Sequence, residues 1–426
     1  MILAAVSPQR EAGLRVLLAS MNDGPGRLKP DNGLIPFQQF DTLHVARLLI
    51  VDDKTREDVR LYGIAPRTYP LYLTLLGDVD GDPDDFLREL ARRAPAGLRT
   101  IFSHCEGFTA QTDLIEWMKA HSVPPAANYI NWLGRTVQRV REEAVLRDRL
   151  EQQIQNNAAA LKGLPPSEIH ARLRQLTHAD IKAGRLALSM ERPTPFGWGL
   201  RNLLHLVGVP VVFVLASPLL IVIAAIGLVR LRRLEKTDPE LCPRPAPADA
   251  AELAVQEDHD VSNQFSAMGS LKPGMVRLWT TMFALLAIDY FARHLYTRGG
   301  LARVRTIHFA RWVFLDGRKR VIFLSNYDGS LESYMDDFIN KVGFGLNLVF
   351  GNGIGYPRTN WLILNGCSDE RQFKTYLRRH QLPTQVWYKA YPGLTAIDLE
   401  RNGRIRRGLE QSSMSDDEAR KWVALL

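Results

Sequence analysis

The hexapeptide TLHVAR at residues 42–47 decides the fold, because it occurs a second time as TIHFAR at residues 306–311. LGDVDG at residues 76–81 returns as LSNYDG at residues 324–329, and LRTIFSHCEGF at 98–108 returns as LNLVFGNGIGY at 346–356. Five further residues return at one constant offset, and the two sets are His121, Pro124, Tyr129, Gly134 and Thr136, then His380, Pro383, Tyr388, Gly393 and Thr395. Matches that keep their order in this way predict an internal repeat.

Apolar spacing gives each copy the predicted order β-α-β-β-α-β. In the first copy we expect strands at 2–6, 43–51, 71–79 and 98–103 and helices at 10–21 and 84–94, followed by a helix at 113–121 and a strand at 128–132. In the second copy we expect strands at 264–268, 307–315, 321–326 and 346–350 and helices at 275–296 and 333–341. This order is that of a ferredoxin-like unit, whose open sheet leaves one face uncovered.

We therefore predict an α+β fold of two tandem ferredoxin-like (βαββαβ) repeats, packed as a pseudo-dimeric α+β barrel with an inserted membrane helical hairpin. The predicted parts are a first repeat at residues 1–135, a charged helical connector at 136–196, a membrane-embedded segment at 197–236, a linker at 237–260 and a second repeat at 261–426. Ser415 and Glu418 have the spacing of a capping box that opens a last short helix.

Tandem units of this kind resemble the dimeric α+β barrel superfamily, which includes dye-decolourising peroxidases, chlorite dismutases and cofactor-free monooxygenases. The strings LHVAR, SNYDG and HCEGF also resemble a bacterial membrane-associated family of uncharacterised chemistry. The first resemblance covers about two thirds of the chain and rests on the order of the elements, so it indicates fold more than function.

Composition excludes several protein classes. The 426 residues are 46% hydrophobic and 23% charged, which is typical of a globular chain and excludes a disordered or fibrous one. The three cysteines form no CxxC pair, so we expect neither a zinc module nor a disulfide scaffold, and a reducing compartment. The net charge of +8 fits an anionic membrane surface or nucleic acid. We discount nucleic acid because the basic residues cluster beside an apolar segment.

That apolar segment, residues 203–229, carries no formal charge and is long enough to span a bilayer. Pro218 near its middle predicts either one kinked span or a hairpin that returns to the same face. The hairpin is favoured because repeats that pack together must lie on one side of the membrane. Basic residues on both flanks agree with a cytoplasmic location for both ends, and they are Arg192, Arg201, Arg230, Arg232, Arg233 and Lys236.

Two other segments bear on the membrane. Residues 275–296 are apolar with few charges, and they predict either an interfacial helix or a helix buried between the sheet and the hairpin. The apolar start at residues 1–6 is too short for the core of a signal peptide, so we expect no export by that route.

Two acidic positions are candidate catalytic residues. Gly77–Gly81 reads GDVDG and resembles the GxxDG motif of dye-decolourising peroxidases, in which the aspartate assists peroxide cleavage. The resemblance implies an acid–base role for Asp80, and Asp328 is its counterpart in the second copy, where the leading glycine is missing. The structural alternative is a turn or helix cap.

Several histidines are further candidates. His104 and Glu106 are expected at the end of the strand 98–103, where alternation places both on one face as an acid–base or metal-binding pair. The alternative is a polar strand end. His44 and His308 begin equivalent strands, with Arg47 and Arg311 three residues later, and His308 or Arg311 can line a barrel cavity. A buried histidine bonded to the backbone is the alternative.

The resemblance to haem-binding barrels implies a haem ligand on a helix near the sheet. His380 is the candidate because Trp387 and Tyr388 follow it, whereas its match with His121 favours a structural helix end. The sequence thus predicts a membrane-attached oxidoreductase acting on a lipophilic substrate, haem-dependent and peroxidase-like. The alternative is a non-catalytic lipid-binding or scaffold protein that uses a cavity between the repeats. Expected partners are the lipid bilayer and a lipophilic small molecule, and a homo-oligomer is compatible with the sequence.

Overall fold

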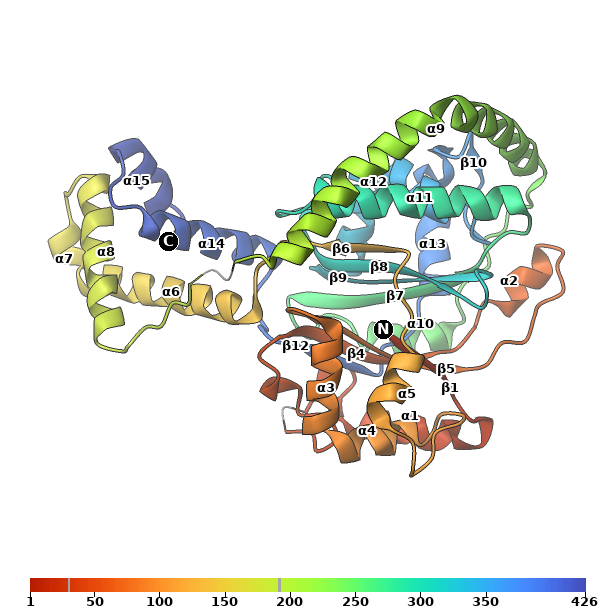
Figure 1. The fold of residues 1–426 in the computed structure, drawn as a ribbon, viewed down its shortest axis with the longest axis horizontal. Helices are drawn as coiled ribbons and strands as arrows, with labels where there is room; N and C mark the ends of the chain where they lie inside the picture. Colours follow the sequence, from red (N-terminus) through yellow and green to blue (C-terminus); the bar gives the residue numbers. More distant parts are fainter. Residues whose placement is uncertain (30, 191–192) are drawn as a thin grey trace. The chain divides into compact units, whose positions relative to one another are not determined.

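The computed structural model describes residues 1–29, 31–190 and 193–426, and it has the α+β class (Figure 1). Arg192, one of the predicted flanking cations, lies outside the described residues. The chain forms two compact units, which are described separately below. One contains residues 1–133 and 195–390, and the other contains residues 134–194 and 391–426.

The larger unit is built on two four-stranded antiparallel sheets. The first has the order β1 (Ile2–Ala5), β5 (Tyr72–Val79), β4 (Leu43–Val51) and β12 (Val386–Lys389). The second has the order β6 (Ala127–Ile130), β8 (Ile307–Leu315), β9 (Arg320–Asp328) and β7 (Ser262–Ser270). The strands predicted at 43–51 and 307–315 agree with β4 and β8 at both ends.

Each sheet is completed by a strand from the other half of the chain. β12 pairs with β4, with Tyr388 opposite Ala46, and β6 pairs with β8, with Tyr129 opposite Ala310. The final strand of each half therefore crosses to the partner sheet. Because both exchanged strands contribute ladder hydrogen bonds, the two halves cannot separate without breaking both sheets.

The two sheets pack face to face through apolar side chains. Leu49, Val51 and Leu76 of the first sheet form one buried cluster with five residues of the second, which are Met268, Val313, Leu315, Ile322 and Leu324. Helices cover the outer faces, so Figure 1 shows layers of helices, sheet, sheet and helices. On the first sheet these are α1 (Glu11–Ser20), α3 (Pro83–Arg93), α4 (Pro95–Phe102) and α5 (Leu114–Ala120).

The outer face of the second sheet is covered by α11 (Met275–His294), α12 (Leu331–Phe350) and α13 (Glu370–His380). Smaller elements of this unit are β2 (Asn22–Gly24), β3 (Arg27–Leu28), α2 (Arg56–Leu61), β10 (Thr359–Asn360) and β11 (Leu364–Asn365). Short 3-10 turns lie at Pro8–Arg10, Phe37–Gln39 and Gly366–Ser368. The predicted linker 237–260 contains a helix, α10 (Pro247–Ala254).

Two buried arginines connect the sheets. Arg47 of β4 donates from Nη1 to the Phe265 carbonyl oxygen at 3.0 Å, and from Nη2 to the Ser325 carbonyl oxygen at 2.8 Å. Burial lowers the pKa of Arg47 to about 10, so it stays charged near neutral pH. Arg311 of β8 forms the reciprocal ion pair with Asp78 of β5. A buried guanidinium is tolerated only when its donors are satisfied, so these contacts fix how the sheets face each other.

Two strand predictions are wrong. Residues 98–103 lie largely in the helix α4, and residues 346–350 form the end of α12. Leu98, Ile101 and Phe102 are all buried, at the i, i+3 and i+4 spacing of a helix face, and Pro95 occupies the first turn. A short apolar run fits either a strand or a buried helix, and here packing against the sheet selects the helix.

The smaller unit is helical. It contains α6 (Val137–Asn156), α7 (Ala158–Leu161), α8 (Pro166–Lys182), α14 (Ala396–Glu410) and α15 (Asp416–Val423). The capping box of Ser415 and Glu418 is confirmed. Residues 391–426, which the sequence assigns to the second repeat, pack instead with the connector, because Leu146 and Leu150 of α6 share a buried cluster with Ile405 and Trp422.

The predicted membrane segment is one helix, α9 (Phe196–Thr237), with Pro210 and Pro218 inside it. Figure 1 shows that α9 changes direction along its length. Near its start, His205 Nδ1 lies 2.8 Å from His294 Nε2 at the end of α11. Just after its last residue, Asp238 accepts a hydrogen bond of 2.6 Å from Arg277 near the start of α11. Between these two attachments most apolar side chains are exposed, whereas Leu231 near the end of the helix is buried.

Replacing Arg47 is expected to destabilise the larger unit. In Arg47→Ala the Phe265 and Ser325 carbonyl groups lose a charged donor inside the sheet interface, so the free energy of unfolding should fall by about 3 kcal/mol. Denaturant unfolding followed by circular dichroism measures this. The exposed Arg88 is the matched control, and Arg88→Ala should change stability by less than about 0.5 kcal/mol. Equal stability of the two variants would contradict the assignment.

Candidate functional site

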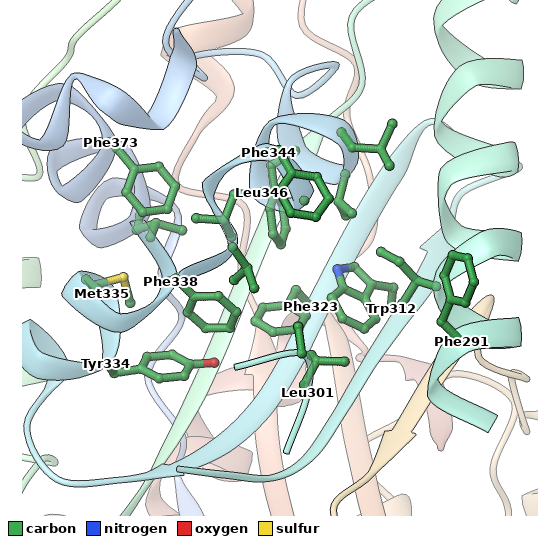
Figure 2. A pocket seen from close by; sticks show the side chains of 18 of the residues that line it. Phe291, Leu301, Trp312, Phe323, Tyr334, Met335, Phe338, Phe344, Leu346 and Phe373 are labelled. Atoms are coloured by element: carbon green, nitrogen blue, oxygen red, sulfur yellow. The ribbon is translucent and has the colours of Figure 1, made fainter. Parts of the chain in front are cut away.

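An apolar pocket of about 200 Å³ lies between the second sheet and the helices that cover it. Figure 2 shows side chains of β8, β9, α11 and α12 around it. Its aromatic lining includes Phe265, Phe291, Trp312, Phe323, Phe338 and Phe344. The sequence predicts a cavity between the two sheets, whereas this pocket lies on the opposite, helix-covered face of the second sheet.

The pocket contains few polar atoms. Among the described residues that line it, none carries a formal charge. The Tyr334 hydroxyl is 2.7 Å from Ser325 Oγ, and burial raises the pKa of Tyr334, so the phenol remains neutral. The Trp312 indole is 4% exposed, and its Nε1 has no hydrogen-bond partner within the described ranges of the chain. The lining therefore suits an uncharged, lipophilic molecule.

Two exposed aromatic side chains, Phe291 and Phe344, lie at the opening of the pocket. Phe344 is 64% exposed and Phe291 is 44% exposed, although both also line the interior. Phe344 follows a kink in α12, where Val342 has the non-helical angles φ −141° and ψ 27°. Cys367 Sγ donates to the Gly343 carbonyl oxygen at 3.3 Å beside this kink. The break in the helix therefore holds an aromatic side chain at the opening.

A buried polar cluster lies at one end of the sheet interface. His308 Nε2 of β8 is 2.6 Å from Asp328 Oδ1 of β9, and Ser262 of β7 donates to the same carboxylate oxygen. Lys389 of β12 donates to Ser262 Oγ at 2.6 Å. All four residues are buried, and none is among the residues lining the apolar pocket.

The first half of the chain carries a related pair. His44 Nε2 of β4 is 3.0 Å from Asp80 Oδ1, just beyond β5, and the His44 ring lies 5.5 Å from Phe309. The structure thus joins each predicted aspartate to the histidine that begins a neighbouring strand, a pairing that the sequence reasoning missed. Because equivalent His–Asp pairs occur in both halves, we interpret them as structural contacts that hold the ends of neighbouring strands together.

Arg311 of the second sheet forms an ion pair with Asp78 of the first. Arg311 was a candidate for lining a cavity, but its guanidinium pairs with Asp78 between the packed sheets. Both side chains are nearly buried. Arg311 therefore takes part in sheet packing, as Arg47 does.

His104 and Glu106 do not form the predicted strand-end pair. They lie in the turn after α4, so the alternation of a strand does not apply to them. His104 Nδ1 donates to the Thr100 carbonyl oxygen at 3.0 Å, whereas Glu106 is exposed. Cys105 between them is buried, and burial raises the pKa of its thiol to about 12.

The residues predicted to hold haem do not fit that group. His380 is buried at the end of α13, its Nδ1 donates to the Tyr376 carbonyl oxygen at 2.8 Å, and the cavity beside it is only about 30 Å³. His121 makes the same bond to the Trp117 carbonyl oxygen, also at 2.8 Å. His308 is held by Asp328 away from the pocket. Equivalent bonds in the two halves support a structural helix end.

Metal ligation finds no support in the described parts of the chain, where no group of three His, Cys, Asp or Glu side chains could hold an ion. The residues that sequence reasoning missed are those of the pocket, Trp312 and Phe344 above all. One signal was available, because the helix predicted at 275–296 is much longer and more apolar than its counterpart at 10–21.

Comparisons of the chain with protein-family models, with curated proteins and with solved structures find no match.

The two His–Asp pairs are expected to differ in their contribution to stability. Asp328→Ala removes the acceptor of both Ser262 and His308 in a buried cluster, so it should cost about 2–3 kcal/mol of unfolding free energy. Asp80 is 19% exposed and water can replace it, so Asp80→Ala should cost about 1 kcal/mol. Denaturant unfolding of both variants checks the order, and a larger loss for Asp80→Ala would show that the assignment is wrong.

Proposed function

We propose that this chain is a membrane-attached protein that binds an uncharged lipophilic molecule in the pocket between α11, α12 and the second sheet. The observation that carries the proposal is the charge-free aromatic lining, with Phe291 and Phe344 exposed at the opening. A dry apolar cavity of about 150 Å³ suffices to bind benzene. A pocket of about 200 Å³ has room for a ring or a short stretch of an acyl chain.

Membrane attachment is proposed to be through α9. The most apolar 18-residue window of this helix has none of its residues buried, and among the described residues two helices, α9 and α11, are long and apolar enough to cross a membrane. Large exposed apolar surface in water is unfavourable, at about 25 cal/mol per Å². Arg230, Arg232 and Arg233 follow the apolar part and suit an anionic surface.

The attachments of α9 support a hairpin-like entry and return. A straight helix from His205 to Asp238 would be about 50 Å long at ~1.5 Å per residue, whereas Arg277 and His294 are about 26 Å apart along α11. The helix therefore has to bend away from α11 between its attachments. Both ends then lie on one side of the bilayer, which we propose to be the cytoplasmic side.

Two more exposed apolar elements are proposed to touch the bilayer. α11 packs Leu285 and Ala292 inward and leaves Trp279 and Phe283 exposed. One face of the helix is therefore buried against the protein, and we propose that the other face lies at the membrane interface. The turn between β10 and β11 exposes Trp361, Ile363 and Leu364.

Glu235 near the end of α9 fixes that turn. Its carboxylate accepts from the Trp361 N–H at 2.9 Å and from the Leu362 N–H at 2.8 Å, while Trp361 and Leu362 have φ values of 53° and 68°. Positive φ is unfavourable for bulky residues, so the carboxylate stabilises a conformation the turn would not otherwise adopt. The exposed turn thus stays beside the end of α9.

For the fold we propose two ferredoxin-like repeats forming a pseudo-dimeric α+β barrel, in which the final strands are exchanged. The element order of the two halves, β1 to β6 and β7 to β12, and the pairing of β12 with β4 and β6 with β8 support it. A relation to the dimeric α+β barrel superfamily is part of this proposal.

The oxidoreductase activity stays a prediction from the sequence. The residues named for it lie in the sheet interface, in a turn or at a helix end, and none of them lines the apolar pocket. Binding of a lipophilic molecule is therefore the function that the geometry supports best.

Topology is checked with single cysteines at Thr194 and Thr237, in a Cys242→Ser background that removes the exposed native thiol. A hairpin-like helix places both positions on one side, so a membrane-impermeant maleimide should label both from the same face of oriented vesicles. The buried Cys105 and Cys367 should stay unlabelled in the folded protein. Labelling from opposite faces would show that α9 spans the bilayer.

Ligand binding is checked by filling the pocket. Ala287 lines it, so Ala287→Phe should weaken binding of the uncharged fluorophore N-phenyl-1-naphthylamine roughly tenfold or more. Leu286→Phe, on the exposed face of the same helix, is the control and should bind as the wild type does. Fluorescence titration in nanodiscs, with empty nanodiscs as blank, measures both. Wild-type protein that gives no signal above the blank would refute the proposal.

A further inference from the structure

We infer that the ligand of the pocket carries a hydrogen-bond acceptor oxygen, which the indole N–H of Trp312 binds. This inference rests on the proposed function and names the chemical class of the ligand: an uncharged lipophile with a carbonyl or ether oxygen. A ketone, an ester and a quinone all belong to this class.

The indole N–H of Trp312 is a buried hydrogen-bond donor at the wall of the pocket. Trp312 Nε1 is buried and has no hydrogen-bond partner in the part of the chain that the structure describes. An unsatisfied buried donor costs about 1–3 kcal/mol, and buried tryptophans usually find a partner for this reason. Figure 2 shows the indole among the lining side chains, with its nitrogen on the side of the ring that faces Phe344. The unpaired donor therefore belongs to the pocket.

Water is a poor partner for the Trp312 N–H in this pocket. A buried water is stable when it finds two to four polar partners. Beyond Trp312 Nε1, the lining side chains offer two hydroxyl groups, that of Tyr334, which is already bonded to Ser325, and that of the half-buried Tyr296. An oxygen atom of a ligand can accept the bond from Trp312 Nε1 without further polar partners, because the aromatic rings around the ligand hold it in place.

The ligand atom that bonds to the Trp312 N–H has to be an uncharged acceptor. The indole nitrogen is a donor only, so its partner must be an acceptor. Since none of the described lining residues is charged, a carboxylate or phosphate would be buried without a counter-charge. A neutral oxygen attached to an apolar body meets both conditions.

The donor also gives the pocket a means of discrimination. A site built to bond one polar group of an otherwise apolar ligand rejects the analogue that lacks this group, because its own polar atom stays unpaired. Trp312 therefore separates oxygen-bearing lipophiles from plain hydrocarbons of the same shape. Phe323 packs beside it, 4.7 Å between ring centroids, and holds the indole in its orientation.

The test uses two probes of nearly equal shape. Acetophenone has a carbonyl oxygen where α-methylstyrene has a methylene group, and both fit a pocket that admits one ring. Their dissociation constants are measured by displacement of N-phenyl-1-naphthylamine from the full-length protein in nanodiscs. We compare the wild type with Trp312→Phe, which keeps an aromatic ring and removes the donor.

The quantity measured is the preference for acetophenone over α-methylstyrene, which should fall about fivefold in Trp312→Phe. Phe338→Leu changes the shape of the pocket but keeps both the donor and the Phe323 ring beside it, so it should leave this preference within about twofold. An unchanged preference in Trp312→Phe would overturn the inference while leaving lipophile binding intact. Wild-type protein that binds neither probe would instead refute the proposed function.

A second readout needs no variant. In protein labelled with ¹⁵N at its eight tryptophans, one indole N–H resonance should move downfield with acetophenone and none with α-methylstyrene. Equal shifts with both probes would contradict a hydrogen bond to the ligand.

Discussion

The larger unit depends on the exchange of the two final strands. β12 extends the first sheet and β6 extends the second, so neither half of the chain has a complete sheet of its own. Long-range pairing of this kind costs loop entropy and forms late, but once formed it pairs one edge of β4 and one edge of β8, and leaves the shorter strands β12 and β6 at the sheet edges. The exchange also sets the distance at which Arg47 and Arg311 reach across the interface, so their buried charges find acceptors on the opposite sheet.

The two halves differ most on their outer faces, and this difference creates the pocket. In the first half, Pro95 interrupts the helical cover, and α3 and α4 pack as two short helices. In the second half, α11 runs for 20 residues against 10 in α1, whereas α12 breaks at Val342, the position that matches Ala94 between α3 and α4. Aromatic side chains of α11, α12 and the second sheet surround the pocket. The apolar pocket thus lies in the second half of the chain, against the sheet that α11 covers.

The buried polar side chains at the sheet interface stabilise the fold, although their residue types are also those found in catalytic sites. His308, Asp328, Ser262 and Lys389 have the residue types of a catalytic cluster, yet they satisfy one another inside the interface. The pocket, by contrast, has few polar atoms, and the buried Trp312 N–H, which has no partner among the described residues, is the more informative feature. In a site without charges, one oriented N–H is enough to select among ligands of equal size.

The sequence by itself determined the class of the fold, the repeated strands and the exposed apolar helix. Repeated apolar runs located β4 and β8, and the length of the uncharged run located α9, because these signals can be read along the sequence. It could not determine that residues 98–102 are helical, since a short buried apolar run satisfies both periods. Only the tertiary structure decided that β6 and β12 exchange sheets and that Asp80 and Asp328 pair with His44 and His308. It also decided that the buried Trp312 N–H has no partner among the described residues. Those outcomes depend on which residues distant in the chain come together, and no local pattern encodes that choice.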